Sequence, residues 1–198
     1  MEKSGFLDAV ERRRSCYSLG GEACVPDRRV VETLKFLVRN VPSSFNSQSQ
    51  RLAVLFGDNH RRLWSIVMET LRRIVPPDKF PRTAKKIDGF AAAHGTVLYF
   101  DDRPTTDEFA EKFPLYAANF PVWSEQANGM LQFAVWCALE ELGFGASLQH
   151  YNPLIDDEVK RTFNIPAGWR LIAQMPFGDL TAPPGPKTFV DADRVLVL

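Results

Sequence analysis

Three short stretches carry the side chains whose types and spacing could do chemistry. The first is ERRRSCY, residues 11–17, where three arginines and a serine fall within five positions. Guanidinium groups hold phosphates through paired, charge-assisted hydrogen bonds, so this stretch could bind a phosphate. Exposed arginines also commonly form a solvated face or complement the carboxyl end of a helix. Taken alone, the stretch favours that second interpretation.

The second stretch, PSSFNSQSQR at residues 42–51, is unusually polar for a connector between a helix and a strand. Its side chains offer donors and acceptors that could read the edge of a polar heterocycle. A turn capped by serine and asparagine would use the same residue types. Both interpretations stay open on these residues alone.

The third stretch, ELGFGASLQHYNP at residues 141–153, contains two glycines that let a backbone approach a flat ligand closely. Its main-chain groups could then meet ring nitrogens. A helix end followed by a strand explains the same residues almost as well. Lys187, in the Pro-rich tail, is uninformative by itself.

The composition is that of an ordinary globular protein and excludes several function classes. The 198 residues, 45% of them hydrophobic, suffice to bury one core. Lysines plus arginines equal aspartates plus glutamates, so the basic excess typical of nucleic-acid binders is absent and we expect no such partner. The sequence contains no run of eighteen apolar residues, so we expect no membrane span. The first fifteen residues, MEKSGFLDAVERRRS, lack the apolar core of a secretory signal.

The cysteines favour a reducing, cytoplasmic location. There are three, at positions 16, 24 and 137, and none forms a CxxC pair. An odd number without that spacing argues against a disulfide scaffold and against a zinc site. We therefore expect free thiols and no bound metal.

Hydrophobic periodicity predicts the elements that must position these stretches. Helices are expected over residues 4–14, 27–40, 60–75, 81–95, 124–143 and 156–165, and strands over 51–56, 96–102, 144–151 and 169–178. Gly57-Asp58 should separate the first strand from the next helix, and Pro114 should break residues 105–120. The longest helix, 124–143, is apolar all round and should be central. The order indicates one α+β domain over residues 1–198, with 179–198 as an extended C-terminal arm.

In this order, the stretches resemble the FMN-dependent nitroreductase family over nearly the whole chain. RRRSCYSLG looks like the family's Arg-Arg-Ser opening, and VPSSFNSQSQRLAVLF is similar to its Pro-Ser-x-x-Asn-x-Gln stretch before the first strand. WCALEELGFGASLQHYN resembles its long helix with Leu-Gly-x-Gly, and IPAGWRLIAQMPFGD its last strand with a Gly-Asp turn. The short length and SFNSQSQR resemble the compact subgroup of Frm-type and small bacterial nitroreductases.

The resemblance implies a mainly antiparallel sheet flanked by helices, in an intertwined homodimer with FMN at the interface. The residues implied at the phosphate and ribityl end are Arg13, Arg14, Ser15 and Lys187. Those implied to reach the flavin from the other subunit are Pro42, Ser43, Ser44, Asn46 and Gln48. Those implied along the isoalloxazine, with a backbone N–H near its N5, are Leu148, Gln149 and His150.

Two positions depart from the family pattern. Tyr17 stands where much of the family has an arginine or lysine near the pyrimidine edge of the flavin. A phenol stabilises an anionic reduced flavin less than a cation does. Ser49 and Gln50 replace the usual Pro-Trp, which changes the packing expected beneath the ring.

The resemblance also implies the chemistry. NADH or NADPH would reduce the flavin, and a nitroaromatic or quinone would then take the electrons at the same face, giving ping-pong kinetics. No side chain need be a nucleophile; His150 is a candidate proton donor. Four aromatic residues are expected either to wall the acceptor pocket or to pack in the core: Phe113, Tyr116, Phe120 and Trp123. The alternatives are a flavin-binding regulatory protein with little turnover and a helical interaction module without flavin.

Overall fold

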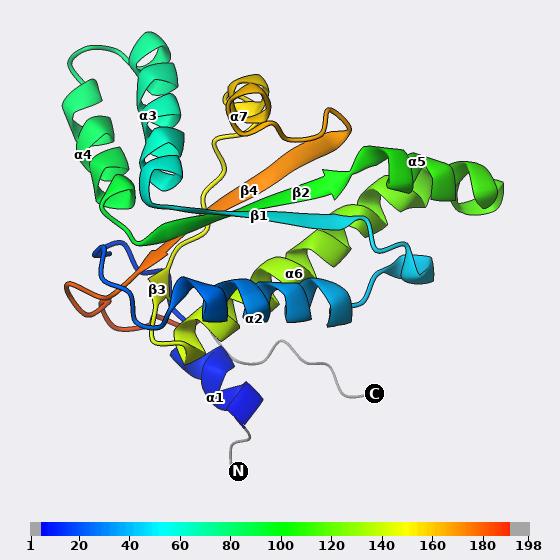
Figure 1. The fold of residues 1–198 in the computed structure, drawn as a ribbon, viewed down its shortest axis with the longest axis horizontal. Coiled ribbons are helices and arrows are strands. Elements are labelled where there is room, and N and C mark those ends of the chain that lie inside the picture. Colours follow the sequence, from blue (N-terminus) through cyan, green and yellow to red (C-terminus); the bar gives the residue numbers. More distant parts are fainter. Residues whose placement is uncertain (1–4, 191–198) are drawn as a thin grey trace.

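The computed structural model describes residues 5–190 and contains one antiparallel sheet of order β1-β2-β4-β3 (Figure 1). Its strands are β1 (Gln50–Phe56), β2 (Gly95–Asp102), β3 (Gly145–Ala146) and β4 (Trp169–Gly178). The helices are α1 (Gly5–Arg12), α2 (Asp27–Asn40), α3 (Gly57–Ile74), α4 (Phe80–Ala91), α5 (Arg103–Lys112), α6 (Phe120–Glu141) and α7 (Asp156–Phe163). Two 3-10 turns, η1 (Ser44–Asn46) and η2 (Pro114–Asn119), complete the set. The predicted α+β architecture with an antiparallel sheet is confirmed.

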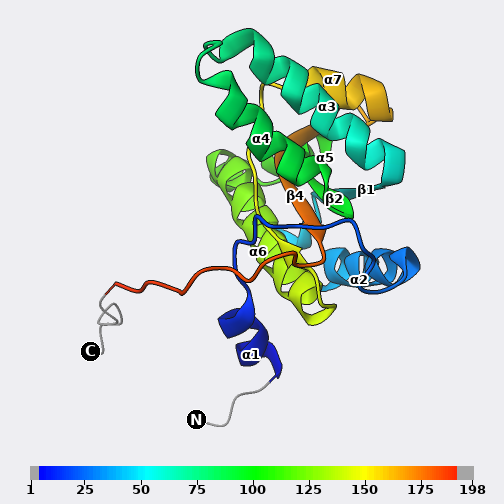
Figure 2. The ribbon, with the colours of Figure 1, turned by 90° about the vertical axis from the view of Figure 1, so that its left-hand side faces the viewer.

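Both faces of the sheet are covered by helices. Helices α2 and α6 lie on one face, and α3, α4 and α7 lie on the other (Figure 2). The alternation along β2 shows why, because Val97 and Tyr99 pack towards α6 whereas Leu98 and Phe100 pack towards α3. A strand buried on both faces reads as a continuous apolar run, as TVLYF does.

A buried amide fixes α6 on the sheet. The β2–β4 pairing shifts register between Tyr99 and Phe100, which disturbs the hydrogen-bond ladder there. Asn128, fully buried on α6, donates its side-chain N–H to the Phe100 carbonyl at 3.1 Å. The Asn128 carbonyl oxygen in turn accepts from Gln132 at 2.8 Å. This pairing leaves little freedom for α6 to rotate or slide, since a buried polar group without a partner is costly.

Helices α3 and α6 begin three and four residues earlier than the sequence predicts. Gly57-Asp58 separates β1 from the next helix as predicted, but α3 already begins at Gly57, whose φ of 54° makes the corner without a loop. Helix α6 begins at Phe120 rather than at residue 124. Pro121 lies in its first turn, where an N–H would have no helical partner in any case.

The predicted third strand, 144–151, was wrong in length, since only Gly145–Ala146 form β3. Further along, Gln149 and Gln174 exchange main-chain hydrogen bonds of 2.7 and 2.9 Å as an isolated bridge. Between these two places Ser147 donates to the Pro176 carbonyl, at 3.3 Å. Proline has no N–H to return the bond, so the ladder is interrupted there.

The C-terminal segment has no regular secondary structure from Asp179 to Val190. Its beginning is tied to the N-terminal part of the chain, because Leu19 and Leu180 form an isolated bridge. The predicted arm extends over residues 191–198 as well, which lie outside the described residues. Over residues 5–190, no helix combines the length and apolarity needed to cross a bilayer.

A buried histidine ties α3 to β2 and α4. His60 Nδ1 lies 2.9 Å from the Thr96 hydroxyl, and its Nε2 lies 3.2 Å from the Ala91 carbonyl. Because a carbonyl only accepts, Nε2 carries the proton and Thr96 donates to Nδ1. The Thr96 oxygen also accepts from the Trp64 indole at 3.0 Å. Burial, the largest cause, lowers the pKa of His60 to about 4, so the ring is neutral at pH 7.

Acidification should therefore destabilise the fold through His60. The unfolded chain binds the proton more tightly, so this contribution is complete above about pH 6.5 and is lost as pH falls towards about 4. The pKa difference sets a ceiling of about 3 kcal/mol. Denaturant unfolding over this range should show a shallower pH dependence for His60→Gln than for the wild type. The exposed His150→Gln serves as the control, and parallel profiles for wild type and His60→Gln would contradict the assignment.

Candidate functional site

The Arg-Arg-Ser stretch is joined to the glycine-containing segment that follows α6. Ser15 and Ala146 form an isolated parallel bridge, and the Cys16 N–H donates to the Ala146 carbonyl at 2.9 Å. The indole N–H of Trp136 is shared between the Arg14 carbonyl at 3.1 Å and the Ala146 carbonyl at 3.2 Å. One side chain of α6 thus holds the first and third predicted stretches together.

Beside this junction lies an open hollow of about 380 Å³. The Arg13 guanidinium stands over the Trp136 ring, 4.5 Å from its centroid, in a cation–π contact. A Cβ atom at Gly129 would meet nothing within 4 Å, so α6 leaves room there. The lining combines a cation, a hydroxyl, an amide and apolar groups: Arg13, Ser15, Gly129, Gln132, Phe133, Trp136 and Leu148.

The predicted lysine joins the two arginines. Lys187 donates from Nζ to the backbone carbonyl of Glu11. Partial burial lowers the pKa of Lys187, and the positive charges of Arg13 and Arg14 lower it further. The Glu11 carbonyl lies two residues before Arg13, so this hydrogen bond brings Lys187 of the tail next to the arginine stretch. Three cationic side chains from opposite ends of the chain therefore converge here, as an anionic ligand would require.

The polar stretch after α2 folds back on itself. The Gln48 N–H donates to the Ser43 hydroxyl at 2.8 Å, and the Gln50 side chain donates to the Pro42 carbonyl at 3.2 Å. Arg51 closes the far side by donating to the Gln48 carbonyl at 2.6 Å. These internal bonds confirm that the stretch is a tight turn. Pro42 and Gln48 of this turn are exposed to solvent.

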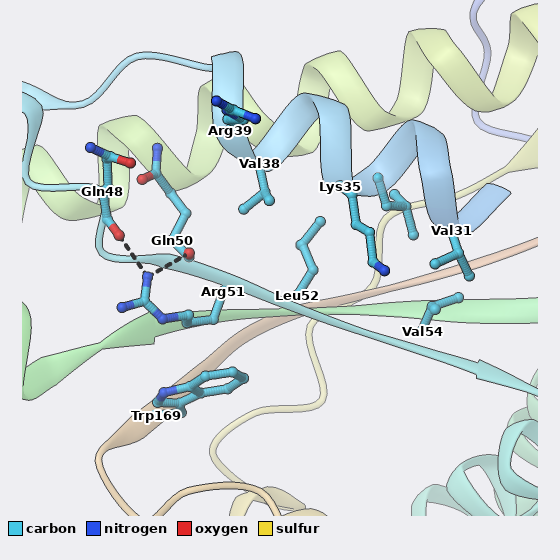
Figure 3. Close-up of a pocket in the computed structure, with 11 residues that line it drawn as sticks. Val31, Lys35, Val38, Arg39, Gln48, Gln50, Arg51, Leu52, Val54 and Trp169 are labelled. Carbon is cyan, nitrogen blue, oxygen red and sulfur yellow. Dashed lines mark hydrogen bonds between the residues drawn. The ribbon is translucent and has the colours of Figure 1, made fainter. Parts of the chain in front are cut away.

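A groove of about 490 Å³ runs between α2 and β1 next to this turn (Figure 3). Its floor is apolar and its rim is cationic, with Arg51 paired to Asp102 at 2.6 Å and placed 5.8 Å from the centre of the Trp169 ring. The lining residues are Val31, Leu34, Lys35, Val38, Arg39, Gln48, Gln50, Arg51, Leu52, Val54 and Trp169. Gln48 is the one predicted flavin residue among them.

Within one chain, the polar turn and the cationic cluster lie at opposite ends of α6 (Figure 1). Phe45, at the centre of the turn, packs on Trp123 with ring centroids 5.8 Å apart. Arg13 packs on Trp136, thirteen residues further along the same helix. At 1.5 Å per residue, about 20 Å separates the two contacts. The fold therefore keeps the two predicted halves of the site apart within a single chain.

The remaining predicted residues divide between the hollow and its surroundings. Leu148 lines the hollow, whereas Gln149 is buried and held by Gln174. His150 is exposed. Tyr17 is exposed as well, and its ring lies 6.4 Å from that of Phe90 on α4, away from the hollow.

Sequence reasoning missed the α6 side of the hollow. Gly129, Gln132, Phe133 and Trp136 follow the i, i+3, i+4, i+7 spacing of one helical face. That signal was present, but the surrounding apolar residues of α6 concealed it. The four predicted aromatic residues instead surround Phe45 at the other end of α6. Of these, Phe120 is buried in the core and Tyr116 is 45% exposed, so core packing is confirmed for Phe120 and the acceptor wall stays a prediction.

The sequence profile of the nitroreductase family matches residues 10–179. Nitroreductase FRM2 of Saccharomyces cerevisiae is 34% identical over 188 residues, which cover 94% of this chain and 93% of the yeast protein. Nitroreductase CinD from Lactococcus lactis in complex with chloramphenicol has a TM-score of 0.89 and 47% identity, covering 98% of this chain and 99% of CinD.

CinD has also been solved in complex with 4-nitrophenol and with nicotinic acid, each 46% identical to this chain. A nitroreductase with bound FMN from Desulfitobacterium hafniense shares the fold, with a TM-score of 0.73 at 16% identity and 99% of each chain covered. The match over residues 10–179 and the two relatives above 30% identity agree with one another. This chain belongs to the nitroreductase family of oxidoreductases and has the nitroreductase-like fold.

Proposed function

We propose that this chain is a cytoplasmic, FMN-dependent oxidoreductase that uses NADH or NADPH to reduce nitroaromatic or quinone-like acceptors by a ping-pong mechanism. The observation that carries the proposal is that Arg13, Ser15 and Leu148 line a hollow beside α6, while Lys187 of the C-terminal tail donates to the Glu11 carbonyl two residues before Arg13. A flavin mononucleotide has one phosphate at one end and a flat ring at the other. The cluster and the hollow offer a partner for each.

The residues present fit FMN by their chemistry. Two guanidinium groups and an ammonium complement a phosphate that carries nearly two negative charges. Ser15 adds a hydroxyl, and Leu148 with the α6 residues adds an apolar wall. The chain has no Gly-x-Gly-x-x-Gly fingerprint for a dinucleotide, which favours FMN over FAD. Bound FMN would supply the two-electron redox chemistry, while the protein would supply binding and orientation.

A homodimer would complete the site. Because about 20 Å of α6 separates the polar turn from the cationic cluster, the turn of one subunit would serve the flavin of the other. Asn46 and Gln48 are exposed in the chain and so are accessible to such a partner. The proposed assignments across the interface remain Pro42, Ser43, Ser44, Asn46 and Gln48.

The CinD complexes support the substrate classes. 4-Nitrophenol is a nitroaromatic, and nicotinic acid contains the pyridine ring of nicotinamide. Two such flat rings using one face in turn would give ping-pong kinetics. His150, exposed after the Gln149 bridge, remains the candidate proton donor, and Leu148 and Gln149 would line the ring.

Tyr17 favours a second candidate, a flavin-binding regulatory protein with little turnover, because no cation stands at that position. Anaerobic stopped-flow mixing with NADH or NADPH separates the two functions. Rapid bleaching of the bound flavin, followed by reoxidation with a nitroaromatic, supports the enzyme. A flavin that stays oxidised supports the regulatory protein.

Removing one cation should loosen the cofactor. Arg13→Ala deletes a charged hydrogen-bond donor and should weaken FMN binding by about 1.5–3 kcal/mol. Fluorescence titration of the apoprotein with FMN measures this, with the exposed Arg28→Ala on α2 as the matched control. An unchanged dissociation constant for Arg13→Ala, or FAD in the heat-released cofactor, would refute the assignment.

Subunit mixing should test the shared site. Asn46→Ala and Arg13→Ala would each impair both sites of their own homodimer. In a mixed dimer, one site would carry both changes and the other neither, so wild-type FMN affinity should return at half the sites. Titration after confirmed subunit exchange decides this. No recovery would mean that both residues serve one subunit's site, or that Asn46 serves none.

A further inference from the structure

Phe45 occupies a backbone conformation that its residue type disfavours. Its φ is 56° and its ψ is 18°, in the left-handed region. Asn46 and Gln48 follow with φ of 54° and 50°, so three of the four non-glycine residues with positive φ in the described chain fall in this turn. Asparagine tolerates this region, whereas a bulky aromatic residue rarely enters it. Something must therefore hold Phe45 in place.

A cage of aromatic rings provides that restraint. The Phe45 ring lies among four others, contributed by the end of α5, by η2 and by the first turn of α6. The centroid separations are 4.6 Å to Phe113, 5.7 Å to Tyr116, 5.4 Å to Phe120 and 5.8 Å to Trp123. Such pairs are favourable beyond the apolar area they bury, so together they can offset the left-handed strain.

Hydrogen bonds transmit this restraint to the neighbouring residues. The Asn46 N–H donates to the Ser43 carbonyl at 3.0 Å, and the Ser47 N–H donates to the Ser44 carbonyl at 3.1 Å. Ser44 and Asn46 therefore flank the anchored ring on a turn that is closed on both sides. Asn46 is exposed, and Phe45 beside it is itself 46% exposed although its ring contacts the four others.

We propose that Phe45 is a positioning residue that holds Ser44 and Asn46 ready for the partner subunit's flavin before the flavin binds. The inference rests on the proposed function. An anchored turn would not lose conformational freedom on binding, which would raise FMN affinity without a direct contact from Phe45. Since Tyr116 and Trp123 belong to the cage, the same anchor would join the proposed acceptor wall to the cofactor site.

The test compares FMN affinity and flavin midpoint potential in the full-length protein. The variants are Phe45→Ala, Phe45→Tyr, Asn46→Ala and the double variant Phe45→Ala/Asn46→Ala, with Ile74→Ala as an exposed apolar control on α3. Phe45→Ala removes the ring that contacts all four cage residues, and the cost of ordering the freed turn on binding should raise the FMN dissociation constant about tenfold. Phe45→Tyr keeps the ring and should retain wild-type affinity.

The double variant separates positioning from ordinary packing. If Phe45 acts through Asn46, the losses of FMN affinity should not add. The double variant should then bind FMN as tightly as whichever single variant has the lower affinity. Phe45→Ala should also shift the midpoint potential in the same direction as Asn46→Ala. Additive losses, or a potential unchanged by Phe45→Ala, would overturn the inference. Should Phe45→Ala fail to fold, Phe45→Leu takes its place in the same comparison.

The two proposals can fail separately. A wild-type protein that binds no FMN after reconstitution would refute the proposed function itself. A wild-type protein that binds FMN, with Phe45→Ala equal to it and to Ile74→Ala, would refute only the role of Phe45.

Discussion

The hydrogen bond from Asn128 to the Phe100 carbonyl is the interaction on which the arrangement of the molecule depends. It meets a main-chain acceptor at the point where the β2–β4 register shifts, and it does so from a fully buried position on α6. A hydrogen bond contributes only about 1 kcal/mol net, but a buried group without a partner costs more. Because of this cost, the bond favours one placement of α6 on the sheet. The positions of the segments that pack on α6 depend on that placement.

Two separate structures are mounted on that helix. At the start of α6, Phe120 and Trp123 pack against Phe45 of the polar turn. Towards its end, Trp136 holds Arg14 and Ala146 by one shared N–H and carries the Arg13 guanidinium on its ring. A helix has a fixed rise, so the distance between these places cannot adapt. One chain therefore cannot bring both ends of α6 to the same small ligand.

The face of the sheet covered by α3 and α4 contains a buried polar network and an apolar core. There His60, Thr96 and Trp64 form a closed buried network in which each polar atom has a partner, and large apolar side chains of α3 and α4 fill the rest. The predicted ligand-binding residues lie mainly at the edges and on the α6 side. Both faces carry a buried core cluster, and the three left-handed residues of the turn, Phe45, Asn46 and Gln48, belong to neither of them.

The sequence by itself determined the elements, because their periodicity and punctuation are local: α2 at residues 27–40 and β4 at 169–178 match the structure. The family resemblance also predicted a shared role for Arg13, Arg14 and Lys187, although Lys187 is uninformative by itself. Tertiary structure decided what depends on distant partners. Pro176 of β4 has no N–H to continue the pairing, so it limits the length of β3. Buried Asn128 fixes α6 against the sheet through its bond to β2. Packing also decides which face of α6 lines the hollow. Residue type fixes what a side chain can do, but long-range contacts fix which groups it meets.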